Sequence, residues 1–177
     1  MNSKSSSTVI SDDLRRILDL SFVLRTTMTR RKSGGFRTIE TTYTWDEADD
    51  GTVRVYLSGY PGARDWVANM GATPAVVVTT VEGEHNYVIS AKARVLKDRN
   101  ERIDHLLAFI DRWVERPDFP RKRFRFVLAS IRLNRRLRLP WWGPFYLVRR
   151  IFDKMPCVEL EFTGEPQPLE GDLPEAT

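Results

Sequence analysis

Apolar and polar residues alternate with a period of two through much of the first hundred positions, which predicts β-strands. A short helix comes first, because Ser11 can cap it and Leu14, Ile17 and Leu18 would share one face. Alternation begins at Leu20 and continues to the next turn. The expected strands are 20–29, 36–45, 53–57, 75–81 and 87–95.

Tight turns separate these strands. Gly34-Gly35 permits a sharp reversal, and Asp50-Gly51 is a strong hairpin signal. The run 75–81 is almost continuously apolar, as expected of a strand buried on both faces. Five closely spaced strands predict an antiparallel meander that closes into a barrel, and a last strand at 157–162 can complete the sheet.

The period changes to that of a helix after the fifth strand. Asp98 or Asn100 can cap a helix whose apolar stripe is Ile103, Leu106, Leu107, Ile110 and Val114. Two further helices are expected, at 124–137 and 145–152. The predicted fold is therefore α+β and mainly β, an antiparallel barrel of about six strands with flanking helices.

A chain of 177 residues has the length of one domain. We expect a loose tail at 1–10, a single domain at 11–163 with a helical insertion at about 98–155, and a disordered tail at 164–177, which is rich in Pro and acids.

Positive charge is concentrated in one segment. Residues 116–154 hold twelve Lys or Arg and two acids, so the rest of the chain holds 28 − 12 = 16 bases and 24 − 2 = 22 acids. A local basic block indicates an anionic partner or surface. The single Cys157 excludes an internal disulfide, and neither His has a partner that suggests a metal site. With no signal peptide and no apolar run of about 20 residues, we expect a cytoplasmic location.

Two polar turns next to strands are the candidate site. The first carries Arg31, Lys32, Ser33 and Gly34, with Arg37 opening the next strand. An anion needs cations, hydroxyls and free backbone N–H groups, and a Gly turn can present all of them. The second turn and the helix after it contribute Ser58, Tyr60, Arg64, Trp66 and Asn69.

These residues resemble the deazaflavin-dependent nitroreductase family, a branch of the split-barrel flavin-binding proteins. The resemblance covers roughly residues 24–96 and also rests on Thr26-Thr27 and Pro74. It implies a split β-barrel, often dimeric, that binds the deazaflavin coenzyme F-420 or, alternatively, FMN. It further implies that Arg31, Lys32, Ser33 and Arg37 hold the anionic tail, that Ser58 and the loop 60–64 lie near the ring or phosphate, and that Trp66 and Asn69 shape the pocket.

The sequence departs from the family pattern in three places. Arg30 and Phe36 stand where Gly and Pro are common, and the Lys-Gly-Gly usual after Ser58 is missing. Arg64 is the candidate to supply the lost charge. By resemblance, the chain is an oxidoreductase that passes hydride to an electron-poor acceptor such as a quinone, nitro compound or conjugated carbonyl.

No residue is marked as catalytic. Tyr60, Tyr146 or water can donate a proton, and Tyr43, Trp141 and Tyr146 are candidates for the substrate side of the pocket. A non-catalytic flavin or deazaflavin carrier is the first alternative function. A membrane-associated binding module on the same barrel is the second.

The basic segment 121–152 mixes cations with aromatic residues and admits three interpretations. It suits an anionic membrane, where aromatics insert and cations meet headgroups, which would place the protein on the inner face of the membrane. It suits RNA less well, with bases stacked on aromatics. The third interpretation is a helical cap with buried aromatics and solvated arginines.

Overall fold

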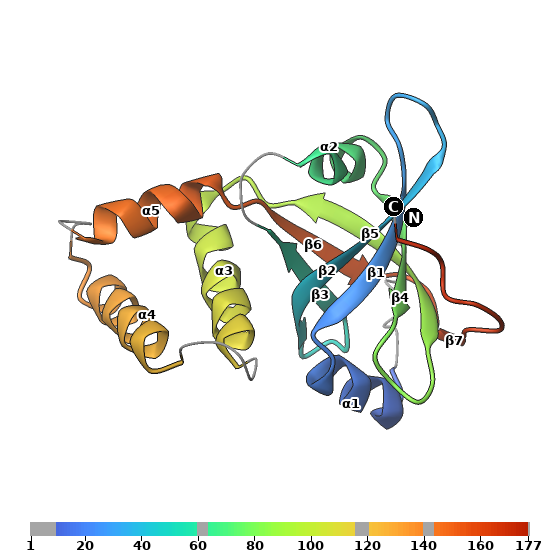
Figure 1. Cartoon of the computed structure of the whole chain (residues 1–177), viewed down its shortest axis with the longest axis horizontal. Helices are drawn as coiled ribbons and strands as arrows, with labels where there is room; N and C mark the ends of the chain where they lie inside the picture. Colours follow the sequence, from blue (N-terminus) through green and yellow to red (C-terminus); the bar gives the residue numbers. More distant parts are fainter. Residues whose placement is uncertain (1–9, 60–63, 116–120, 140–143, 177) are drawn as a thin grey trace.

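A computed structural model of the protein describes residues 10–59, 64–115, 121–139 and 144–176. Six antiparallel strands close into a barrel in the order β4-β1-β2-β3-β6-β5, with β5 pairing back to β4 (Figure 1). The strands are β1 Val23–Thr29, β2 Phe36–Glu47, β3 Val53–Ser58, β4 Ala75–Thr80, β5 Tyr87–Val95 and β6 Cys157–Phe162, with a short β7 at Gln167–Pro168.

The predicted antiparallel barrel of about six strands is confirmed, but only its first part is a meander. β1, β2 and β3 pair in sequence, whereas β4 pairs with β1 and β5. β6 closes the barrel by inserting between β3 and β5. The last strand therefore completes the sheet, as its sequence pattern predicts.

In the part of the chain that the structure describes, five helices flank the barrel in two groups. α1 and α2 lie at opposite ends of the barrel, and α3, α4 and α5 form a layer at its side, between β5 and β6 in sequence (Figure 1). The insertion predicted at 98–155 is therefore helical where the structure describes it. The helices are α1 Asp12–Leu20, α2 Asp65–Ala72, α3 Arg99–Val114, α4 Arg121–Arg136 and α5 Pro144–Lys154.

Side-chain caps set two of the helix starts. Ser11 Oγ accepts from the backbone N–H of Leu14, and Asp98 accepts from two N–H groups in the first turn of α3, at 2.9 and 3.0 Å. The expected start of the first strand at Leu20 is wrong. Leu20 is the last residue of α1, with Ser21 as its C-cap, and its side chain is 68% exposed.

The expectation of a strand buried on both faces was placed on the wrong segment. In β4, Ala75 and Val77 are exposed, since the outer side of this part of the barrel faces solvent. β3 and β6 are the strands covered on both sides, because α3 packs over their outer face and Phe152 of α5 joins the same apolar core. The apolar run of β4 therefore does not show that both of its faces are buried. Burial of the outer face depends on where the helices pack.

The described residues form two apolar cores. The larger fills the barrel and includes α1, through Leu14 and Leu18, and α2, through Trp66 and Met70. The smaller lies between the outer face of β3 and β6 and the helical layer. Its buried members are Tyr56, Leu96, Ile103, Leu106, Leu107, Phe109, Leu128, Ile131, Phe152, Met155 and Cys157.

Both chain ends need correction where they are described. Ile10, assigned to a loose tail, is buried in the barrel core. The segment 164–176, expected to be disordered, contains β7, which pairs with Tyr87 and Val88 of β5. The carbonyl of Pro174 also accepts a 2.8 Å hydrogen bond from Arg25. Backbone pairing thus holds a segment whose polar composition predicts disorder.

Candidate functional site

A cationic cleft lies beside the turn between β1 and β2. Its volume is about 470 Å³, and we call it the hairpin cleft. The four bases in its lining face a single acid, Asp65, so an anion is the favoured occupant. The lining residues are Arg30, Arg31, Lys32, Ser33, Arg37, Asp65 and Asn69.

Backbone hydrogen bonds shape the turn of the hairpin cleft. The N–H of Gly34 donates to the carbonyl of Arg30 at 2.9 Å, and the N–H of Arg30 donates to the carbonyl of Gly35 at 2.8 Å. Gly34 has φ +71°, a conformation that favours glycine. From α2, the buried Asn69 accepts a 3.2 Å hydrogen bond from the backbone N–H of Arg31. α2 therefore holds the turn in place without using the Arg31 side chain.

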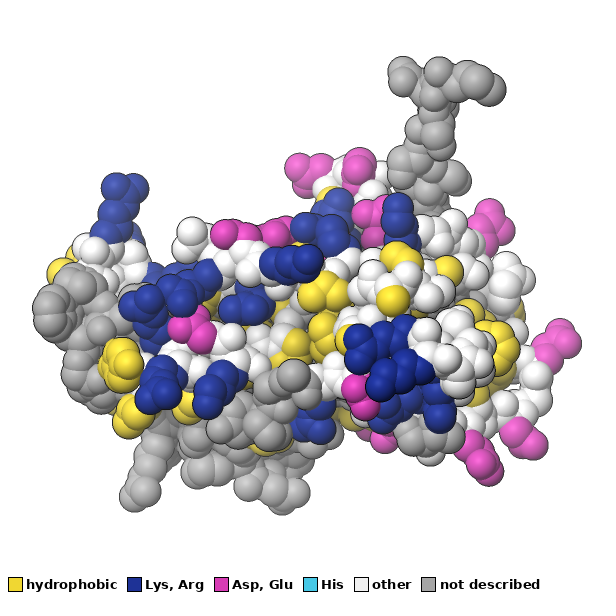
Figure 2. Space-filling model, turned by 90° about the horizontal axis from the view of Figure 1, so that it is seen from above, with side chains coloured by type: hydrophobic (Ala, Val, Ile, Leu, Met, Phe, Trp, Pro, Cys, Tyr) yellow, Lys and Arg dark blue, Asp and Glu magenta, His cyan; other side chains and the backbone are white. Residues whose placement is uncertain are grey.

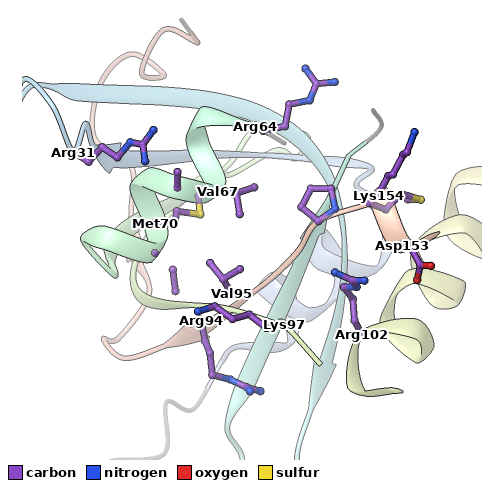
Figure 3. Close-up of a pocket in the computed structure, with 15 residues that line it drawn as sticks. Arg31, Arg64, Val67, Met70, Arg94, Val95, Lys97, Arg102, Asp153 and Lys154 are labelled. Carbon is purple, nitrogen blue, oxygen red and sulfur yellow. The ribbon is translucent and has the colours of Figure 1, made fainter. Parts of the chain in front are cut away.

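A second and larger cleft, of about 740 Å³, lies on the other side of α2, and we call it the helix cleft. It is formed by α2, the end of β5, the start of α3 and the end of α5 (Figure 3). Val67, Ala93, Val95, Met155 and Pro156 supply apolar surface, and charged side chains surround it. The charged lining residues are Arg31, Arg64, Arg94, Lys97, Arg102, Asp153 and Lys154.

Some charged side chains of the helix cleft are already paired with other residues of the protein. Arg94 forms a bidentate pair with the buried Glu159, at 2.9 and 3.0 Å, and a 2.7 Å ion pair with Glu101. These carboxylates, Glu159 first, raise the pKa of Arg94 above its ordinary value. Asp153 is held between Arg99 and Arg149. Arg94 is thus already neutralised by the protein.

Four other bases of the helix cleft make no ion pair with a carboxylate in the part of the chain that the structure describes; they are Arg31, Lys97, Arg102 and Lys154. Lys and Arg side chains gather across the face of the molecule that contains α2 (Figure 2). The helix cleft therefore also favours an anionic group, next to apolar surface that suits a planar ring.

Arg31 joins the two clefts, since it lines both. α2 lies between them and owes its orientation to a simple periodicity: Trp66, Asn69 and Met70 are buried, and Val67 and Gly71 line the helix cleft. In Figure 3, Arg31 lies at one side of Val67 and Met70, and Arg102 and Lys154 lie at the other. A single elongated ligand can therefore contact cations in both clefts.

The structure brings most of the predicted site residues together. Arg31, Lys32, Ser33, Arg37 and Asn69 line the hairpin cleft, with Gly34 forming its turn, and Arg64 lines the helix cleft.

Ser58 and Trp66 have supporting positions. The hydroxyl of Ser58 is buried and donates to the carbonyl of Pro156 at 2.7 Å, which fixes a wall of the helix cleft. Trp66 packs in the barrel core beneath α2.

Three tyrosines and one tryptophan are proposed for substrate or proton transfer, and the two that the structure describes line neither cleft. Tyr43 is fully buried, its hydroxyl donates to the carbonyl of Leu18, and burial raises its pKa above the ordinary value. It is a core residue. Tyr146 is exposed on α5, with the Arg150 guanidinium 6.0 Å from its ring centre, and lines neither cleft. Tyr60 and Trp141 lie outside the described residues.

Sequence reasoning missed four bases of the helix cleft: Arg94, Lys97, Arg102 and Lys154. A signal existed for three of them, because Arg94, Lys97 and Arg102 occur where the chain leaves the barrel for α3. Lys154 had no such signal. It reaches the cleft only because α5 ends beside β6.

Comparison with solved structures supports the fold. A conserved hypothetical protein from Mycobacterium tuberculosis is 8% identical, with a TM-score of 0.58 and 99% of each chain covered. A putative pyridoxamine 5'-phosphate oxidase from Listeria innocua is 12% identical, with a TM-score of 0.53, covering 89% of this chain and 96% of that one. HutZ, the heme storage protein from Vibrio cholerae, is 8% identical, with a TM-score of 0.53 and coverage of 91% and 95%.

At these identities the likeness shows the fold, which is the split β-barrel with flanking helices. No protein-family model matches the chain, and no curated protein matches it. The resemblance to deazaflavin-dependent nitroreductases therefore stays a prediction. Among the described residues, no helix has the length and apolar character needed to cross a membrane.

Proposed function

We propose that the protein is an oxidoreductase that uses a flavin-type cofactor, with a deazaflavin of the F-420 kind as the first candidate and FMN as the second. One observation carries the proposal: Arg31 joins a cationic cleft to a second cleft that combines apolar surface with further cations. Such a cofactor has the same two parts, a planar ring and an anionic tail.

The residues present fit such a group. The volumes, about 470 and 740 Å³, lie in the range of small-molecule sites, roughly 300–1,000 Å³. Arg31, Lys32 and Arg37 would hold the anionic tail by charge-assisted hydrogen bonds. The apolar lining of the helix cleft, including Val67 and Val95, would hold the ring and exclude water from one side of it. When bound, the cofactor supplies hydride to an electron-poor acceptor such as a quinone, nitro compound or conjugated carbonyl.

A reductase needs a proton donor for the reduced acceptor, whereas a carrier that only stores the cofactor does not. The described lining of the helix cleft has no hydroxyl, imidazole or thiol, and its candidate proton donors are the side chains of Lys97 and Lys154. One of these lysines, or water, would protonate the acceptor. The lack of an imidazole or hydroxyl in this described lining favours the second candidate function, a carrier that binds the cofactor without turnover.

Titration of the purified protein with F-420 and with FMN, followed by cofactor fluorescence, tests the proposal. Menadione is then added to the reduced complex. We expect saturable binding of one cofactor and reoxidation faster than that of free cofactor. Binding without acceleration by any acceptor would identify the carrier. Absence of binding by both cofactors would overturn the proposal.

Two substitutions test the tail site. Arg31→Ala and Lys32→Ala should each weaken cofactor binding by roughly 1.5–3 kcal/mol, the contribution of a hydrogen bond to a charged group. Folding is expected to survive, because Asn69 holds the backbone of residue 31 and not its side chain. Arg16→Ala, at an exposed position on α1, is the matched control and should leave affinity unchanged. If both variants bind the cofactor with wild-type affinity, its anionic tail does not bind in the hairpin cleft.

A further inference from the structure

The outer face of α4 carries an exposed apolar stripe. Phe126, Leu133 and Leu137 are 75%, 56% and 57% exposed. They are spaced by seven and four residues, so they share one face of the helix, and Ser130 lies between them. The backbone N–H of Leu137 still donates to Leu133, which keeps it on the same helical face. The apolar stripe faces water in the isolated molecule.

The inner face of α4 is already used. Three residues at every third position of α4 are buried inside the helical layer. They are Leu128, Ile131 and Asn134. Arg135 and Arg132 pair with Asp104 and Asp111 of α3, which locks the rotation of α4 about its axis. The helix therefore has two apolar faces, and packing inside the molecule accounts for only one of them.

Exposed apolar residues continue beyond α4. Leu139 lies just past its end, and Leu147 and Ile151 recur at four-residue spacing on α5, beside Tyr146. Single exposed apolar residues are normal on proteins, whereas several that recur along one face of a helix mark a candidate interaction site.

Positive charge borders the stripe. Arg125, Arg136 and Arg138 are exposed, and no carboxylate of the described residues pairs with them. Residues 121–139 contain no Asp or Glu. Figure 2 shows Lys and Arg side chains alternating with apolar ones at the end of the molecule where α4 and α5 lie. Apolar residues flanked by Arg are typical of helices that lie in the interface of an anionic membrane.

We propose that the outer face of α4, together with the exposed apolar residues of α5, docks on an anionic lipid surface. The apolar stripe enters the boundary between headgroups and acyl chains, and the arginines contact anionic headgroups. This inference is independent of the cofactor proposal.

Two other occupants fit the surface less well. A second copy of the chain, related by a two-fold axis through this face, would bring Arg125, Arg136 and Arg138 against a copy of the same helix, in which residues 121–139 include no acid. Single-stranded RNA stacks its bases on aromatic rings, and this surface offers only Phe126 and Tyr146 for that purpose among the described residues. Its other exposed apolar residues are aliphatic: Leu133, Leu137, Leu139, Leu147 and Ile151. Lipid accommodates both the aliphatic side chains and the charge.

Co-sedimentation with vesicles tests the proposal. The protein is mixed with phosphatidylcholine vesicles that contain about 30% phosphatidylglycerol and, separately, with pure phosphatidylcholine vesicles, at low and high salt. We expect binding to the anionic vesicles that weakens with salt and is much weaker on neutral ones.

Matched variants separate the two contributions. Each of Arg125→Gln and Arg136→Gln should reduce partitioning about fivefold, and Phe126→Ser with Leu133→Ser should reduce it more than about tenfold. The controls are Arg16→Gln and Leu20→Ser, which change exposed residues on α1 and should have no effect. Because all these positions are exposed, the variants should fold, which circular dichroism checks.

Three results would overturn the proposal. The first is no binding to anionic vesicles, and the second is binding that survives Phe126→Ser with Leu133→Ser. The third is a wild type that does not bind vesicles but forms a dimer in sedimentation velocity, or binds an RNA oligonucleotide, and loses that property in these variants. That result would assign the surface to a second copy or to RNA.

Discussion

Cys157 shows how position changes the chemistry of one side chain. It begins β6 and is buried in the smaller core, between the barrel and the helical layer. Burial raises the pKa of its thiol to about 12, and the nearby positive charge of Arg102 offsets only part of the effect. A thiol in such surroundings is a small apolar group and a poor nucleophile, since the thiolate is the reactive form.

Reaction of Cys157 with a disulfide reagent at pH 8 should therefore be at least about 100-fold slower in the folded protein than in denaturant. The sign of the pH effect on stability follows from the same shift. The thiol ionises near its ordinary pKa of 9.0 when unfolded and near 12 when folded, so its contribution is intact below pH 9 and falls above it.

Between pH 8 and pH 10, the stability advantage of the wild type over Cys157→Ala should shrink by roughly 1 kcal/mol. Denaturant titration of both proteins at the two pH values measures it. A constant difference would mean that the thiol is not desolvated.

One arginine of helix α3 links it to the end of α1 and to the barrel. The guanidinium of Arg112 donates to the carbonyls of Leu18, Asp19 and Ser21, at the end of α1, and lies 4.7 Å from the ring centre of Tyr43. The last carbonyls of a helix lack partners within the helix, and a cation there also interacts favourably with the helix dipole. Arg112 therefore links α1, α3 and β2.

Arg112→Met should reduce the free energy of unfolding by about 2–4 kcal/mol, since it removes the guanidinium donor from the carbonyls of Asp19 and Ser21. The carbonyl of Leu18 keeps its hydrogen bond from the Tyr43 hydroxyl. Denaturant unfolding measures the loss. Arg16→Met on α1 is the control, because Arg16 is exposed, and it should change stability by less than about 0.5 kcal/mol. A small effect of Arg112→Met, similar to the control, would show that water replaces the guanidinium at no cost.

Considered as a whole, the molecule is a closed barrel with a helical layer at one side. Each barrel strand is hydrogen-bonded on both edges, whereas α3, α4 and α5 are joined to the barrel by side-chain packing in the smaller core and by a few polar contacts. Regions held by fewer backbone links open more readily. We therefore expect the helical layer to unfold locally before the barrel.

Leu106→Ala in the smaller core and Leu24→Ala in the barrel core should each destabilise the protein by about 2–5 kcal/mol, because both side chains are fully buried. Amide hydrogen exchange distinguishes them. Leu106→Ala should reduce protection mainly in α3 and α4, and Leu24→Ala should reduce it throughout the barrel and the helices. Equal loss of protection everywhere in Leu106→Ala would show that the two cores unfold as one unit.

Local patterns were enough to predict most helices and strands of this protein, but not β7 or the start of β1. Alternation of apolar residues predicts the strands, the caps at Ser11 and Asp98 predict two helix starts, and Gly34 predicts the turn of the hairpin cleft. These features depend on side chains and dihedral angles within a few residues of each other. For the same reason the cations at 31, 32 and 37 could be grouped from sequence, since one turn contains them.

The remaining features depend on which elements meet in space. Lys154 joins Arg31 at the helix cleft only because α5 ends beside β6, and β3 and β6 are buried on both faces only because the helical layer covers them. Tyr43 becomes a core residue because α1 and Arg112 close over it. Hydrophobic burial and ion pairing act between residues that are distant in sequence, so a pattern read along the chain does not contain them.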